Sequence, residues 1–189
     1  MWWLEIENLD ERLNELAGDT SVIDPTAVIE PGAILDDTLG PIVIGPRSKI
    51  CTGAVLRGPI VIGAECLVGN LSMVRGPVLI GDRVSIGPQC FVADSKVDED
   101  AYLGAQVRTS NQRLDREAIS VRMGNREIAT NCDKLGCWIG ARASLGIQVI
   151  VLPGRVIAAD SLFEPRVTIA RNHPSGRYRA RQAVELVAA

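Results

Sequence analysis

His173 is the only histidine in the 189-residue sequence, so it is the only imidazole that could exchange a proton near neutral pH. It lies in a tail that begins at Arg171 and also holds Arg177, Arg179 and Arg181. Guanidinium groups in such a cluster suit the phosphates of a nucleotide-bearing ligand, and a tail can reach the cleft of a neighbouring subunit. A lone surface histidine beside a solvated basic end is the simpler interpretation, and both stay open.

One histidine excludes a metal site of three imidazoles within a single chain, and we expect no metal requirement. The five cysteines are an odd number. Cys66 and Cys90 fall at positions that the repeat described next turns inward, so we expect buried free thiols and not a disulfide framework. Cys90 is accordingly expected in the core and not as a nucleophile.

The element that must position these side chains is a repeat of six residues. An aliphatic residue opens nine consecutive six-residue words, at Ile44, Ile50, Leu56, Ile62, Val68, Val74, Ile80, Ile86 and Val92. The fifth place of each word is usually small or β-branched, at Ser48, Ala54, Ile60, Cys66, Ser72, Val78, Val84 and Cys90. The pattern returns at Ile139, Leu145, Val151, Ile157, Phe163 and Ile169, and a weaker run, Ile23 and Ile29, precedes it.

A six-residue word makes one short strand and a turn, so three words close a triangular coil of eighteen residues. The segment LRGPIVIG, residues 56–63, returns almost unchanged as VRGPVLIG, residues 74–81, after one such coil. Successive coils would stack about 4.8 Å apart with the opening aliphatic residues inside. The sequence therefore predicts an all-β fold, a parallel β-helix over residues 21–170.

Three segments fall outside the repeat. Residues 1–20 predict a short amphipathic helix with Asn8 and Glu11 at its start, Leu9, Leu13 and Leu16 on one face and Gly18 after it, covering the N-terminal end of the stack. Residues 109–137 must leave the coil as a long loop or a protruding hairpin, either functional or a plain excursion. Residues 171–189 form a non-repetitive tail, whose last part could be a short helix.

Composition restricts the partners. The net charge is −3, with ten acidic residues and one basic residue in residues 1–37, and no basic face studded with aromatic residues appears, so nucleic acid is not expected. No apolar run approaches the roughly 20 residues of a membrane span. The first residues are too acidic for a signal peptide, and a cytoplasmic location is expected.

Residues 111–157, from NQRLDREAIS to LPGRVI, strongly resemble the acetyltransferase half of bifunctional sugar-1-phosphate nucleotidyltransferases of the archaeal and actinobacterial type. The likeness extends over about residues 38–170, and its most specific parts are Lys134 to Gly140 and Pro153 to Ile157. The start, WWLEIENLDERLNEL, resembles the linker that follows the nucleotidyltransferase domain in that family. The resemblance implies a left-handed coil, a homotrimer with its sites between subunits, and acetyl-CoA or another acyl-CoA as co-substrate.

The resemblance also assigns substrate-binding residues. Arg57 and Asn111 match an arginine that binds the sugar phosphate and an asparagine of the site, and Arg75 replaces a phosphate-binding lysine. Arginine presents a planar fork of donors where lysine presents a point charge, so phosphate recognition could survive with altered geometry. Phe91 replaces a tyrosine, and Tyr102 replaces an asparagine near the acetyl-accepting amine.

The catalytic histidine of the family is absent. Pro88 occupies its place, or Gln89 if the alignment shifts by one residue, and neither can act as a base. Asp94 matches a family position with an orienting or turn role. We therefore take Gln89, Asp94, Tyr102 and His173 as candidates for the catalytic group, and Ala105 with the three arginines of the tail at 177, 179 and 181 for the coenzyme.

Three functions remain open. The first is CoA-dependent N-acyl transfer to an amino sugar or related amine, in which proximity and backbone donors replace the lost base. The second is a non-catalytic trimeric scaffold or ligand-binding protein, with a separate nucleotidyltransferase as a possible partner. The third is a different reaction in the same cleft, carried out by Asp94, Tyr102 or His173.

Overall fold

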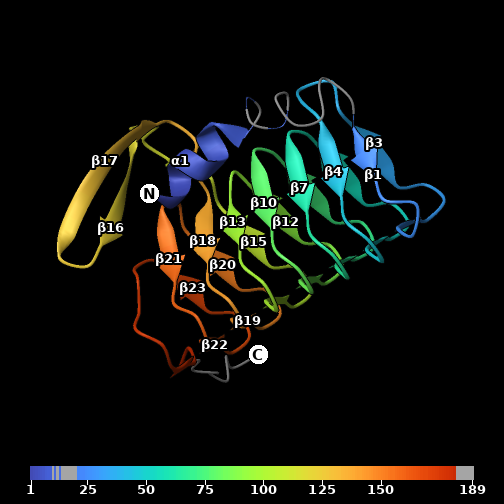
Figure 1. Cartoon of the computed structure of the whole chain (residues 1–189). Helices are drawn as coiled ribbons and strands as arrows, with labels where there is room; N and C mark the ends of the chain where they lie inside the picture. The colour runs from blue at the N-terminus through green and yellow to red at the C-terminus, as the bar shows by residue number, and fades with distance from the viewer. Residues whose placement is uncertain (10, 12, 14–20, 182–189) are drawn as a thin grey trace, which may run out of the picture.

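The computed structural model describes residues 1–9, 11, 13 and 21–181. In this part the chain winds into a three-sided stack of short parallel strands, with a hairpin projecting at one end (Figure 1). The three sides are parallel sheets of seven, eight and seven strands, which we call faces A, B and C. The predicted all-β parallel β-helix is thereby confirmed.

The strands of each face follow the chain from coil to coil. Face A contains β1 (Val22–Ile23), β4 (Ile42–Ile44), β7 (Ile60–Ile62), β10 (Val78–Ile80), β13 (Lys96–Val97), β18 (Cys137–Ile139) and β21 (Arg155–Ile157). Face B contains β2 (Val28–Ile29), β5 (Lys49–Ile50), β8 (Leu67–Val68), β11 (Ser85–Ile86), β14 (Tyr102–Leu103), β19 (Ser144–Leu145), β22 (Leu162–Phe163) and β24 (Arg177–Tyr178). Face C contains β3 (Ile34–Asp36), β6 (Val55–Arg57), β9 (Met73–Arg75), β12 (Phe91–Ala93), β15 (Arg108–Thr109), β20 (Ile150–Val151) and β23 (Thr168–Ile169).

The core is the column of residues that open the six-residue words. Ile44 pairs with Ile62, and Ile62 with Ile80, so identical places of successive coils lie directly above one another. All nine opening residues from Ile44 to Val92 are at most 3% exposed, as are the eight fifth-place residues. Ile23 is 41% exposed because the first coil has a described neighbour on only one side.

The coil continues beyond Val92, where the run of nine consecutive six-residue words ends. The interval from Val92 to Val97 is five residues instead of six, and Val97, Leu103 and Thr109 then occupy the same buried columns. Val97 pairs in turn with Ile139, across the excursion. The shortened word therefore shifts the six-residue frame by one residue, while the coil itself continues to the excursion.

The excursion is a hairpin of β16 (Ile119–Met123) and β17 (Arg126–Cys132), which pair antiparallel. This confirms the prediction of a protruding hairpin within residues 109–137. Its base is packed: Ile119 and Val121 are buried in a second cluster that includes Trp2, Trp3 and Ile6.

A helix that the sequence analysis did not predict, α1 (Trp2–Glu7), comes first, and Asn8 follows its last turn as the C-cap. Helical residues resume directly after Asn8, at Leu9, Glu11 and Leu13, in agreement with the predicted start, and Leu9 and Leu13 are buried as expected. The two tryptophans draw the helix against the hairpin base and face A, and Glu5 binds Lys96 of β13 at 2.7 Å. The described helix thus lies along one side of the stack and does not cover its first coil, while Leu16 and Gly18 lie outside the described residues (Figure 1).

The tail closes the other end of the stack. Its strand β24 adds to face B beside β22, and the ring of Tyr178 stacks on Phe163 with centroids 4.8 Å apart. The segment after residue 181, where a short helix was predicted, lies outside the described residues.

All five cysteines are free, and Cys51, Cys66, Cys90 and Cys137 are buried, which confirms the expectation of buried thiols. The helical part of the described chain includes no segment that is both long and apolar enough to cross a membrane.

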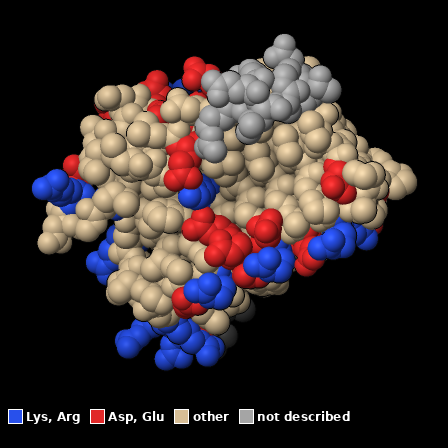
Figure 2. All heavy atoms as spheres, in the orientation of Figure 1, with Lys and Arg blue, Asp and Glu red and all other residues tan. Residues whose placement is uncertain are grey.

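The turns from face A to face B, which we call corner AB, carry a ladder of opposite charges. Each arginine contacts a carboxylate of the next coil in the pairs Arg47–Glu65, Arg83–Asp100 and Arg142–Asp160. Figure 2 shows acidic and basic side chains alternating along this lower edge of the molecule. The side chains of this ladder are exposed, and each of its arginines forms an ion pair with a carboxylate.

Candidate active site at the corner where the hairpin leaves

The turns from face C to face A, which we call corner CA, hold a buried carboxylate, that of Asp94. Strand β12 ends at Ala93, and Asp94 follows with a positive φ of 46°. The chain leaves the coil after β15 at Asn111 and returns at Leu135 and Gly136. The amide of Leu135 donates to the Asn111 carbonyl at 2.9 Å, and that of Gly136 donates to the Asp94 carbonyl at 2.7 Å, so the returning chain holds both residues in place.

The side chains of this corner converge on Asp94. Its carboxylate accepts a hydrogen bond from the Nδ2 of Asn111, and the two residues are only 7% and 9% exposed. The guanidinium of Arg75 lies 5.8 Å from the centroid of the Phe91 ring. Arg75 and Lys134 are the two cations that act on the Asp94 carboxylate. We call Arg75, Phe91, Asp94, Asn111 and Lys134 the Asp94 cluster.

Burial raises the pKa of Asp94 above its ordinary value of 3.8, although the hydrogen bond from Asn111 and the charges of Arg75 and Lys134 act in the opposite direction. A carboxylate with a raised pKa holds a proton more readily than an exposed one does. Buried, perturbed groups of this kind are over-represented at sites of proton transfer. The cluster can therefore accept a proton next to a place that attracts anions.

Arg57 lies one coil away from the cluster. Its position in β6 is directly opposite Arg75 in β9, and its guanidinium binds Asp36 at 2.8 Å. The structure thus brings four of the predicted residues, Arg75, Phe91, Asp94 and Asn111, into one cluster with Arg57 beside it. Lys134 belongs to this cluster but was not predicted as a site residue, although it begins the Lys134–Gly140 motif that carried the family resemblance.

The remaining catalytic candidates lie elsewhere in the chain. Gln89, with its neighbour Pro88, precedes β12 and so lies at the opposite end of that strand from Asp94. Its side chain accepts a hydrogen bond from Gln106 at 2.8 Å, the first rung of a ladder that continues through Gln148 to Arg166. Tyr102 is on face B and 49% exposed. Within one chain neither residue reaches the Asp94 cluster.

His173 lies at the C-terminal end of the stack. Its ring is 4.8 Å from Tyr178 and 5.9 Å from Phe163, between centroids, so it belongs to the aromatic cap of the last coil. Cys90 is 2% exposed and burial raises the pKa of its thiol, which agrees with the expected core position. His173 as a catalytic group stays a prediction.

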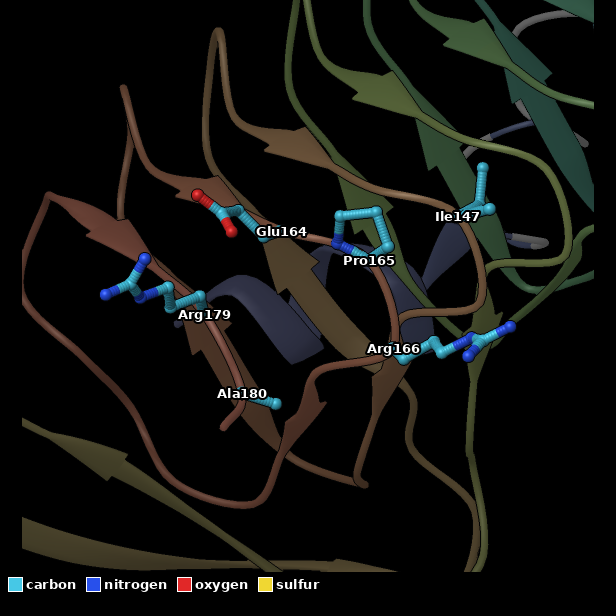
Figure 3. A pocket seen from close by; sticks show the side chains of 6 residues that line it. All are labelled: Ile147, Glu164, Pro165, Arg166, Arg179 and Ala180. Atoms are coloured by element: carbon cyan, nitrogen blue, oxygen red, sulfur yellow. The ribbon is translucent and has the colours of Figure 1, made fainter. Parts of the chain in front are cut away.

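The predicted coenzyme residues follow the turns from face B to face C, which we call corner BC. Ala105 lies in a turn of this corner, and Arg179 lines a cavity of about 300 Å³ near the end of the same edge. The cavity is also lined by Ile147, Glu164, Pro165, Arg166 and Ala180. Figure 3 shows the guanidinium groups of Arg166 and Arg179 pointing in opposite directions, away from Pro165. Arg177 is bound to Glu164 at 2.9 Å, and Arg181 is exposed.

Comparison with known proteins identifies the family of the chain. Residues 59–94 match the family described as bacterial transferase hexapeptide (six repeats). The uncharacterized acetyltransferase YaiX of Escherichia coli K12 is 51% identical over 203 residues, covering 96% of this chain and 87% of YaiX. The chain therefore belongs to the hexapeptide-repeat acetyltransferase family. Within that family it is a relative of YaiX.

Two further similarities are more limited. A bifunctional sugar-1-phosphate nucleotidylyltransferase/acetyltransferase of Sulfurisphaera tokodaii is 32% identical over 88 residues, or 47% of this chain and 22% of that protein. Derivation from the bifunctional type consequently stays a prediction. The structure of a variant of AntD, an N-acyltransferase from Bacillus cereus, matches with a TM-score of 0.52 at 14% identity, covering 94% of this chain and 88% of AntD. At that identity the match supports the fold alone.

Proposed function

We propose that the protein is an acyl-CoA-dependent N-acyltransferase that acts, as a homotrimer, on an amino sugar carrying a phosphate or a nucleotide. The observation that carries this proposal is the buried Asp94, whose pKa is raised and which Asn111 holds at a corner with two cations. The membership of the YaiX group supports acyl transfer as the reaction. The acceptor class is proposed by analogy with AntD, whose structure of the same fold contains dTDP-4-amino-4,6-dideoxyglucose and coenzyme A.

In this proposal Asp94 replaces the base that the family histidine would supply. The acceptor enters as an ammonium ion and loses a proton to the Asp94 carboxylate, which frees the nitrogen lone pair. The nitrogen attacks the thioester carbonyl, the new C–N bond forms and the C–S bond breaks. The attacking nitrogen still carries one proton more than the amide product, and this second proton passes to the departing CoA thiolate. Asp94 releases the first proton to solvent, which returns the enzyme to its starting state.

The phosphate of the acceptor is assigned to Arg75 and Arg57. Both lie on face C in neighbouring coils, and Arg75 is also near Asp94, so a phosphate bound there would place the rest of the acceptor along corner CA. Arginine forks suit phosphate oxygens through paired hydrogen bonds. Phe91, under the guanidinium of Arg75, fixes its direction.

The trimer is assigned to faces B and C because large apolar side chains are exposed on both. Those on face B are Val28, Leu67, Tyr102 and Leu162; those on face C are Ile34, Met73 and Ile150; Leu71 and Ile147 lie on corner BC between them. Burial of such a surface by copies of the same chain is favourable. Tyr102 and His173 reach an Asp94 cluster in this arrangement only if a neighbouring subunit supplies them.

The coenzyme is assigned to corner BC, along the turn with Ala105 and the cavity that Arg166 and Arg179 flank. Because these two guanidinium groups diverge, each would contact a different phosphate or a different subunit's ligand. Arg177 and Arg181, on either side of Arg179 in the tail, add guanidinium groups at this end.

The first test is thermal unfolding of the full chain titrated with acetyl-CoA and CoA, with the oligomeric state measured by native mass. A ligand at 100 times its dissociation constant stabilises the native state by about 2.7 kcal/mol. We expect a saturable rise in Tm that is reduced when Arg177, Arg179 and Arg181 are changed together to glutamine and is unaltered in Arg126→Gln, an exposed hairpin control. No rise at millimolar acetyl-CoA, or a stable monomer, would refute the proposal.

The second test is the pH dependence of acyl transfer to a panel of amino sugars, followed by CoA release. If Asp94 accepts the proton, the wild-type rate reaches a plateau above the raised pKa of Asp94, whereas the rate of Asp94→Asn keeps climbing into the alkaline range with the free amine. A steep climb in the wild type itself would show that only the free-base amine reacts, as expected from proximity alone. Coenzyme binding without transfer to any amine would favour the ligand-binding scaffold.

A further inference from the structure

A second cavity lies at the base of the hairpin, outside the Asp94 cluster and the cavity at corner BC. It has a volume of about 300 Å³ and is lined by Ser120 and Arg122 of β16, Glu127 of β17, Arg155 of β21, and Arg171 and Asn172 of the tail. Three segments distant in the sequence thus place three guanidinium groups and one carboxylate around one cavity. We call it the arginine cavity.

The positive charge in the arginine cavity is not compensated within the described chain. Glu127 contacts only Arg122, at 4.0 Å, which is the limit of an ion pair. Arg155 donates to the backbone carbonyls of Pro153 at 3.0 Å and Ala170 at 3.3 Å. Among the residues that the structure describes, neither Arg155 nor Arg171 has a carboxylate within ion-pair distance, in contrast to the paired arginines of corner AB.

The walls of the cavity are held in place. Asn172 accepts a hydrogen bond from the backbone amide of Val156 at 2.9 Å and donates one to the carbonyl of Arg122 at 2.8 Å. This asparagine therefore ties the tail to both β21 and the hairpin, and it fixes the relative positions of the three arginines. The backbone segments that carry the charged groups are therefore held close together by hydrogen bonds.

The environment of Arg155 opposes its own charge. Burial lowers the pKa of Arg155, and Arg122 and Arg113 lower it further by repulsion, while Glu127 partly offsets them. A guanidinium is held charged in such a place at a cost that a bound anion would remove. Phosphate oxygens fit several guanidinium forks at once, and a cavity of this volume is at the lower end of the range for small-molecule sites.

We propose that the arginine cavity binds the phosphate or diphosphate group of a small molecule, at a site separate from the proposed acyl-transfer and coenzyme sites. Arg122 and Arg171 would contact the anion from the hairpin and the tail, and Arg155 from the floor between them. Since the tail and hairpin both contribute, binding would also fasten the tail to the coil.

The test uses the full chain in a buffer free of phosphate, with inorganic pyrophosphate and inorganic phosphate as probes. Calorimetric titration and thermal unfolding are recorded for the wild type, Arg122→Gln, Arg171→Gln and Arg155→Lys. Arg126→Gln, an exposed arginine of the same hairpin, and Arg179→Gln, from the cavity at corner BC, are the matched controls. Every titration is repeated in chloride of equal ionic strength and again with saturating CoA.

We expect saturable binding of pyrophosphate that Arg122→Gln and Arg171→Gln each weaken about tenfold or more, because each removes a charge-assisted contact. Arg155→Lys should weaken binding while keeping the positive charge, which distinguishes loss of the guanidinium geometry from loss of charge. Arg126→Gln should bind as the wild type does, and Arg179→Gln should do so once CoA saturates the proposed coenzyme site. Equal weakening in Arg126→Gln, or equal stabilisation by chloride, would overturn the proposal as a general charge effect. Loss of pyrophosphate binding in the presence of CoA would overturn it by showing that the cavity is the coenzyme site.

Discussion

Corner AB and corner CA both contain arginines and carboxylates, but the two corners arrange these groups differently. At corner AB every arginine of the ladder has a carboxylate in the next coil, and the side chains are exposed. At corner CA the carboxylate of Asp94 is buried, and in the arginine cavity Arg155 has no carboxylate within ion-pair distance among the described residues. Exposed ion pairs contribute little to stability, whereas buried or unpaired charges need another reason to be present.

The two corners also respond to pH in opposite directions. The bidentate contact with Arg83 lowers the pKa of Asp100 at corner AB, while burial raises the pKa of Asp94 at corner CA. Along a coil that repeats every eighteen residues, departure from the paired pattern thus marks the place where a ligand is expected.

The largest effect is expected on turnover. Asp94→Asn should reduce kcat/KM for acyl transfer by about 10²- to 10⁴-fold, the usual contribution of a positioned base, because asparagine keeps the shape but cannot accept the proton. Asp100→Asn, the same change at corner AB, should leave turnover unaltered. CoA release under initial-rate conditions measures both, and equal rates for the two variants would remove Asp94 from the chemistry.

The next effect is on folding at corner CA. A methyl group at Gly136 would overlap the Ser95 hydroxyl and the Ala93 carbonyl oxygen, which belong to the residues on either side of Asp94 in the chain. Gly136→Ala should lower the free energy of unfolding by about 1–3 kcal/mol or more, as overpacking of a tight core does. Urea denaturation measures it, with Gly176→Ala as control, where the nearest atoms belong to the Tyr178 side chain. Equal midpoints would mean that this corner is looser than its geometry indicates.

The pH dependence of Tm should change in opposite directions in Asp94→Asn and Asp100→Asn. Because the folded-state pKa of Asp94 is raised, its favourable contribution is present at low pH and is lost as pH rises from about 3.8 through the raised value. Asp94→Asn should therefore gain Tm relative to the wild type over that range. Asp100 has a lowered pKa, so Asp100→Asn should lose Tm above the ordinary pKa, and the loss should vanish as the pH falls. Parallel Tm profiles for the two variants would contradict the assignment.

The coil was predictable because its signal is repeated. Each six-residue word places an aliphatic side chain in the core, so a single divergent word such as the five-residue step to Val97 shifts the frame without hiding the fold. The helix α1 was missed because Asn8 and Glu11 form a local capping pattern only for the residues that follow them, whereas α1 depends on burial of Trp2 and Trp3 against the hairpin, a contact more than a hundred residues away in the sequence.

The site was predictable only in part, for a similar reason. Arg75, Phe91, Asp94 and Asn111 came from the family resemblance, and the register of face C brings them together. Lys134 reaches them only because the hairpin returns beside Asn111, and no local pattern predicts where an excursion returns. The arginine cavity has the same origin, since its three arginines come from a hairpin, a strand and a tail that no repeat relates.

The smallest effect concerns two exposed arginines. Arg83→Gln breaks two hydrogen bonds to Asp100, of 2.6 and 2.9 Å, and should lower Tm slightly at low ionic strength, with the difference fading in about 1 M salt, where charges are screened within about 3 Å. Arg122→Gln removes a charge that repels Arg155, and in phosphate-free buffer it should raise Tm slightly instead. Calorimetric scans at both salt concentrations measure the pair. A fall in Tm for both variants would mean that the arginine cavity is as well compensated as corner AB, and the contrast between paired and unpaired charge would then not identify a binding site.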